Sequence, residues 1–150
     1  MQISRSKAAI VARLALGTLF LVFGLNGFFH FIPQPAQPPP PEALAFAGAL
    51  FQTGYMFPLI KGTEVVVGLL LLSNRFVPLA LTILAPIVVN ILAFHLFLAP
   101  AGLALPFIIT ALGIYLATTE RAIFAPFFRA KSSEPVPPSE RSGSRAAAHA

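Results

Sequence analysis

The sequence predicts an all-α protein, a four-helix transmembrane bundle with a short interfacial helix between its first and second spans. Of its 150 residues, 57% are hydrophobic and only 10% are charged, whereas a soluble domain carries roughly a quarter charged residues. The apolar residues form four blocks, each close to the about 20 residues that a bilayer span needs. Lys and Arg fall on alternate connections between these blocks, as in multi-pass membrane proteins.

The four apolar blocks predict spans at about residues 8–31, 55–73, 76–98 and 103–118, within one membrane domain of residues 1–128. Basic residues precede the first span and follow the fourth, and Arg75 separates the second from the third. The connections 33–53 and 99–102 carry none. Because basic loops stay in the cytoplasm, both termini are predicted to be cytoplasmic. A cleaved signal peptide is the alternative for the N-terminus, although the apolar stretch there is long and contains Arg13.

Two segments outside the spans have a distinctive composition. The proline-rich run 33–41 cannot be helical and predicts an extended polyproline II connection. Residues 42–51 then predict a short helix at the outer membrane surface, with Phe46 among the side chains available to the lipid boundary. This connection is either a stiff spacer or a lid over a site. The tail 129–150 is rich in Ser, Pro, Ala and Arg, which predicts a disordered cytoplasmic segment.

Polar side chains are predicted to gather in the outer half of the bundle. They are Asn26 and His30 late in the first span, Lys61 and Glu64 early in the second, and Asn90 and His95 late in the third. A charge at mid-membrane costs about 2.5–3.5 kcal/mol, so ionisable residues there are functional candidates. We interpret the six as a polar pocket that relays protons or binds the polar head of a quinone-like molecule. The alternative is a self-satisfied hydrogen-bonded network that fixes helix register.

Several function classes are excluded by composition and motif. The chain has no cysteine, so it has no disulfide, thiolate nucleophile or thiolate metal site. A metal is not expected in the pocket, because Lys61 repels cations and no His-x3-His pair is present. The net charge of +5 does not indicate nucleic-acid binding, since the basic residues flank apolar blocks. No phosphate loop, nucleophile elbow or dinucleotide fingerprint is present, so the sequence does not show whether the protein is an enzyme.

Three stretches carry a resemblance to a known family: Gly24-Leu25-Asn26-Gly27-Phe28-Phe29-His30-Phe31, Lys61-Gly62-Thr63-Glu64 with the apolar run after it, and Pro86 to His95. Over about residues 10–118 the chain resembles the DoxX family of small bacterial membrane proteins. The resemblance implies a four-helix protein of the bacterial inner membrane. The family takes its name from an association with a thiosulfate:quinone oxidoreductase subunit, and some members are linked to oxidative-stress complexes. Without cysteine, this chain cannot carry a persulfide.

Three functions are therefore open. The first is a subunit or accessory of a quinone-linked redox system, with no cofactor held within the chain beyond a quinone-like ligand in the outer pocket. The second is a non-catalytic assembly partner, either of a redox enzyme or of further copies of this chain. The third is a small transporter, which is the least supported because the apolar inner half of the bundle offers no polar path.

Overall fold

The structure is a computed structural model that describes residues 7–33 and 38–128. Its helices are α1 (Lys7–Phe29), α2 (Pro41–Gln52), α3 (Met56–Leu72), α4 (Val77–Phe97), α5 (Ala104–Thr119) and α6 (Arg121–Phe124), with two 3₁₀ turns, η1 (Pro100–Gly102) and η2 (Ala125–Phe128). Throughout these ranges the structure contains helices and turns and no strand, which confirms the all-α prediction. The predicted tail and the centre of the proline-rich run lie outside the described residues.

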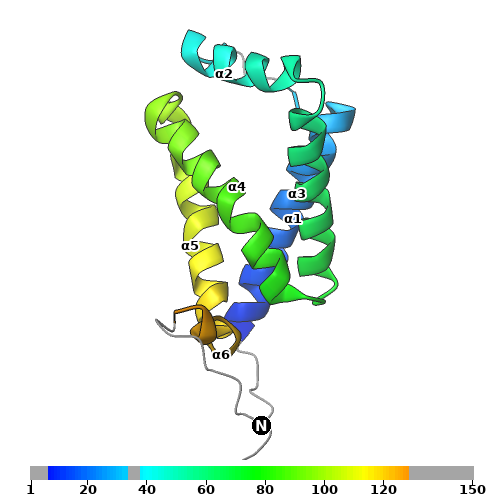
Figure 1. The fold of residues 1–150 in the computed structure, drawn as a ribbon, viewed down its shortest axis with the longest axis vertical. Helices are drawn as coiled ribbons and strands as arrows, with labels where there is room; N and C mark the ends of the chain where they lie inside the picture. The colour runs from blue at the N-terminus through cyan, green and yellow to red at the C-terminus, as the bar shows by residue number, and fades with distance from the viewer. Residues whose placement is uncertain (1–6, 34–37, 129–150) are drawn as a thin grey trace, which may run out of the picture.

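The four longer helices run side by side, and α2 lies across one end of them (Figure 1). The closest pair is α1 with α3, while α4 packs on α5 and contacts α3, and α5 returns to α1. The axes of α2 and α3 meet at 92°, so the chain turns sharply between them. Each helix predicted from an apolar block is present, and its ends lie within two residues of the predicted bounds.

Only some of these helices are long enough to cross a membrane by themselves. By length and composition α1 and α4 qualify, and a third span exists if α2 and α3 count as one broken segment. The helix α3 has 17 residues and α5 has 16, fewer than the about 20 that a span ordinarily uses. The structure thus supports a membrane protein with two or three apolar helices of spanning length, and it does not by itself confirm four spans.

Glycines account for the close approach of α1 to α3. A Cβ atom added at Gly68 would lie 2.7 Å from the backbone nitrogen of Leu21 and 2.9 Å from the carbonyl oxygen of Gly17. A Cβ at Gly24 would lie 2.9 Å from the backbone nitrogen of Val65. Small residues allow such backbone contact between membrane helices. The glycines Gly17, Gly24 and Gly27 of α1 are therefore turned toward α3.

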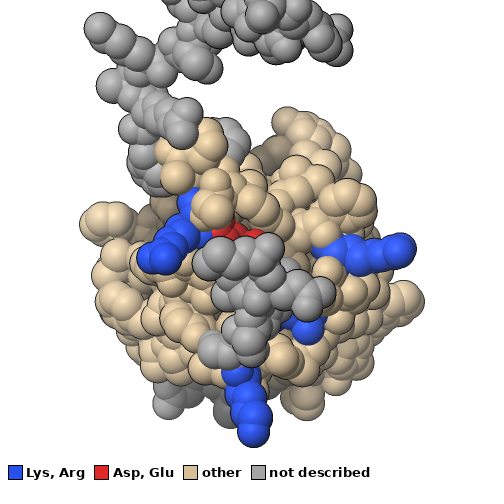
Figure 2. Space-filling model, turned by 90° about the horizontal axis from the view of Figure 1, so that it is seen from below, with Lys and Arg blue, Asp and Glu red and all other residues tan. Residues whose placement is uncertain are grey.

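Basic residues mark the end of the bundle opposite α2. Lys7 begins α1, Arg75 lies in the turn between α3 and α4, and Arg121 begins α6; Figure 2 shows Lys and Arg side chains around this end. Arg13, in the half of α1 nearer this end, is only 9% exposed. Its Nη1 donates hydrogen bonds to the carbonyl oxygens of Leu71 and Leu72. It therefore supplies a donor to Leu72, whose carbonyl ends α3 without a helical partner, and a further donor to Leu71, which also accepts from the backbone nitrogen of Asn74.

Candidate functional site

A cavity of about 260 Å³ lies within the part of the bundle nearer to α2. Its walls come from all four long helices: Leu19, Phe20 and Phe23 of α1, Lys61 and Glu64 of α3, Ile91 and His95 of α4, and Leu105 and Ile109 of α5. Three of these side chains are polar or ionisable, and the others are aliphatic or aromatic. Small-molecule sites commonly combine a mostly apolar wall with a few placed polar groups. We call this cavity the inter-helix pocket.

The ionisable centre of the inter-helix pocket is an ion pair within α3. Nζ of Lys61 donates to Oε2 of Glu64 at 2.8 Å, and the two side chains are 22% and 4% exposed. Lys before Glu is the less favourable order within a helix, yet the two side chains pair with each other within α3. The residues opposite the pair on α1 are Gly24 and Gly27, which have no side chain to offer.

His95 lies in the last turn of α4, at the η1 edge of the inter-helix pocket. Its Nδ1 is 2.8 Å from the carbonyl oxygen of Ile91. A carbonyl can only accept, so Nδ1 carries a proton, and in the neutral ring Nε2 carries the lone pair. A Cβ at Gly102 would lie 2.8 Å from Cδ2 of the ring, so glycine lets the η1 turn close against His95. The ring of Phe94 packs edge-on at 5.1 Å between centroids.

The structure brings together three of the six predicted site residues and leaves three outside the inter-helix pocket. Oδ1 of Asn26 accepts a hydrogen bond from the backbone nitrogen of Ile32 at 2.7 Å, which ties down the exit of α1. His30 is exposed and has a left-handed backbone (φ 51°) directly after that helix. Asn90 is exposed on α4 and is absent from the pocket wall. The six predicted residues therefore do not form one cluster, and the pocket contains Lys61, Glu64 and His95.

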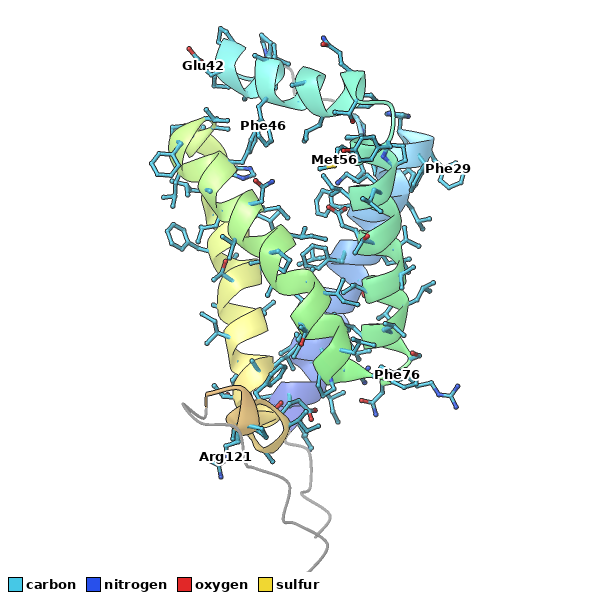
Figure 3. All side chains as sticks on the ribbon, in the orientation of Figure 1. Phe29, Glu42, Phe46, Met56, Phe76 and Arg121 are labelled. Carbon is cyan, nitrogen blue, oxygen red and sulfur yellow. The ribbon has the colours of Figure 1, made fainter. Side chains whose placement is uncertain are left out.

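The helix α2 covers the end of the bundle near the inter-helix pocket. Phe46 is directed from α2 toward the bundle (Figure 3), and its ring lies 5.6 Å from that of Phe94. At the bend, Phe51 of α2 stacks on Phe57 of α3 at 4.0 Å. The bend itself includes Gly54 with φ 75°, a conformation that favours glycine. Aromatic contacts in the middle of α2 and at its C-terminal end thus hold it over the bundle.

The apolar wall of the inter-helix pocket is what sequence reasoning missed. Phe20, Phe23 and Ile109 look like other apolar residues of their helices, and no sequence signal distinguishes them. A larger groove of about 450 Å³ lies between α4 and α5, but its lining includes no ionisable residue. Within residues 7–33 and 38–128, no group of three or more His, Asp or Glu side chains is placed to hold a metal ion.

Comparison with known proteins adds no relative: no family model, curated protein or solved structure matches the chain.

Proposed function

We propose that this protein is a DoxX-like integral membrane protein whose inter-helix pocket binds the polar ring of a quinone-like amphiphile. In this proposal the chain serves as a subunit or accessory of a membrane redox system in the bacterial inner membrane. The resemblance of residues 10–118 to the DoxX family supports this assignment on the motifs quoted above.

The observation that carries the proposal is the contrast between the polar groups and their surroundings. An ion pair and an imidazole line a small cavity whose remaining walls are apolar. Glu64 is 3% exposed, and burying a carboxylate is costly even when it is paired. Register between helices can be fixed more cheaply by glycine contacts, which α1 and α3 already make. A ligand with a polar head and an apolar body accounts for both features of the site.

The size of the cavity points to the part of the ligand that it receives. Sites for whole drug-sized molecules measure about 300–1,000 Å³. The inter-helix pocket, at about 260 Å³, is slightly smaller. A single substituted ring fits this volume, and the hydrocarbon tail of an amphiphile would remain among the lipids. A quinone-like molecule has this division between ring and tail.

The proposed membrane frame places all four long helices across the bilayer and α2 along its outer surface. The basic residues Lys7, Arg75 and Arg121 stand at the end opposite α2, and positive residues accumulate on the cytoplasmic side. Both termini are then cytoplasmic, and the inter-helix pocket opens in the outer half of the membrane. Reporter fusions in the α1–α2 and α3–α4 connections test this frame, since only the first should be exported.

The function is tested by purifying the full chain with its native lipids and identifying bound small molecules and proteins by mass spectrometry. We expect a quinone-like molecule in the wild-type sample and its loss in Glu64→Gln and His95→Ala. Thr63→Ala is the matched control on α3, because the Thr63 hydroxyl donates to the carbonyl of Leu59 in its own helix and Thr63 does not line the pocket. A folded protein that retains no such molecule, and that gains none when quinone is added, contradicts the proposal.

A further inference from the structure

We infer that the inter-helix pocket selects the reduced, dihydroxy form of a quinone-like ring over the oxidised, dicarbonyl form. This inference rests on the proposed function and names the chemical state of its ligand. The pocket wall carries two hydrogen-bond acceptors, one on Glu64 and one on His95, for which the described residues supply no donor, and a hydroxyl is the complementary donor.

Glu64 supplies the first free acceptor. Its Oε2 accepts from Lys61, whereas Oε1 has no donor among the residues that the structure describes. Within those residues, no buried side-chain nitrogen or oxygen lacks a partner. The small exposed part of Glu64 must therefore include Oε1, and the open space beside Glu64 is the inter-helix pocket. An ionised carboxylate oxygen is a strong acceptor that gains most from an O–H donor.

His95 supplies the second free acceptor. The carbonyl of Ile91 holds the proton on Nδ1, so Nε2 of the neutral ring presents a lone pair. Nε2 has no hydrogen-bond donor in the described part of the chain, and it too escapes burial. The imidazole is fixed in this orientation by its packing against Phe94 and Gly102. The pocket thus offers two positioned acceptors on different helices.

Lys61 supplies the ammonium of the wall, and one of its three N–H donors is engaged by Glu64. Its ammonium binds Glu64 at 2.8 Å and lies 5.9 Å from the centre of the Phe57 ring. A quinone carbonyl can accept from a remaining N–H of this ammonium, but it leaves both free acceptors without a donor. A buried acceptor left without a donor loses the full value of its hydration. A phosphate-bearing lipid headgroup is disfavoured for a different reason, since its anion would meet the Glu64 carboxylate.

The experiment compares three ligands of nearly equal shape on the full-length protein in phosphatidylcholine nanodiscs. They are decylubiquinol, decylubiquinone and the dimethyl ether of the quinol, which keeps the ring but has no O–H donor. Reductant can maintain the quinol without altering the protein, because the chain has no cysteine. We expect decylubiquinol to bind about tenfold or more tightly than the other two, because it adds one charge-assisted hydrogen bond to Glu64 and a neutral one to His95.

Two variants locate the effect. His95→Phe keeps an aromatic ring against Gly102 but removes Nε2, and Glu64→Gln replaces the charged acceptor by an amide. Both should bring the affinity for decylubiquinol down toward that for decylubiquinone. His30→Phe is the matched control, because His30 is exposed and outside the pocket; it should leave the preference unchanged.

The outcomes separate this inference from the function on which it rests. Equal affinity for quinol and quinone, or tighter binding of the quinone, overturns the inference and leaves the proposed function standing. Binding of neither ligand to a folded protein refutes the proposed function itself. If added phosphatidylglycerol displaces the quinol, a lipid headgroup occupies the pocket and the inference is wrong. A preference for the quinol that His95→Phe abolishes and His30→Phe preserves supports it.

Discussion

Replacing Gly27 by alanine would place one methyl group against the side chain that holds the buried carboxylate. The added Cβ would lie 2.4 Å from Cγ and 2.6 Å from Cδ of Lys61. Carbon atoms pack at about 3.5–4.0 Å, so the stem of Lys61 must retreat by about 1 Å or more. The Cβ of Lys61 is itself only 3.1 Å away, which leaves little room for a small adjustment. We therefore expect Lys61 to change rotamer and its ammonium to leave Glu64.

The cost can be estimated from its parts. Overpacking a close contact costs about 1–3 kcal/mol, and loss of a hydrogen bond to a charged group adds about 1.5–3 kcal/mol. Alanine recovers up to about 1 kcal/mol of helix propensity. The expected net loss is about 2–5 kcal/mol. The matched control is Gly62→Ala on α3, where an added Cβ meets nothing within 4 Å, so this variant should be neutral or slightly more stable.

The difference in stability between the two variants is measured by thermal unfolding in the same detergent, monitored by far-ultraviolet circular dichroism. Decylubiquinol affinity measured on the same samples shows whether the pocket is disturbed. If Gly27→Ala and Gly62→Ala unfold at the same temperature, the pairing of Lys61 with Glu64 does not depend on the space beside Gly27, and the reasoning fails.

Other substitutions test the remaining contacts. Lys61→Met leaves the Glu64 carboxylate buried without its partner and should lower stability by about 3–5 kcal/mol. The double variant K61M/E64M removes both charges and should recover most of that stability. Unfolding midpoints that show no recovery in the double variant would contradict the pairing. Arg13→Met removes the side-chain donor to the carbonyl of Leu72 at the end of α3 and should cost about 1–3 kcal/mol. An unchanged midpoint would mean that this carbonyl is satisfied without Arg13. Phe46→Ala removes the ring contact with Phe94, which is worth about 0.5–1.5 kcal/mol beyond its buried area. Amide hydrogen exchange should therefore accelerate in α2 and not in α1. Equal exchange rates in wild type and variant would show that other contacts hold α2 in place.

The helices could be predicted from the sequence because each block is predominantly apolar along its length and is followed closely by a polar residue or a proline. The site could be predicted only in part, because position along a helix and rotation about its axis are separate quantities. Counting residues placed Asn26 and Glu64 at similar depth, since each residue advances a helix by about 1.5 Å. Whether a side chain then faces the neighbouring helix depends on packing. Asn26 instead binds its own chain at Ile32, a local contact that depth cannot predict.

The unequal lengths of the four long helices have a consequence for the surrounding lipid. At about 1.5 Å per residue, α3 with 17 residues and α5 with 16 are about 25 Å long, while α1 with 23 and α4 with 21 exceed about 30 Å. The hydrocarbon layer of a bilayer is about 30 Å thick. With all four helices crossing as proposed, the longer pair must tilt and the lipid beside the shorter pair must thin. This hydrophobic mismatch would make the protein favour thinner regions of membrane, and it would bring water nearer to Glu64 without any movement of the helices.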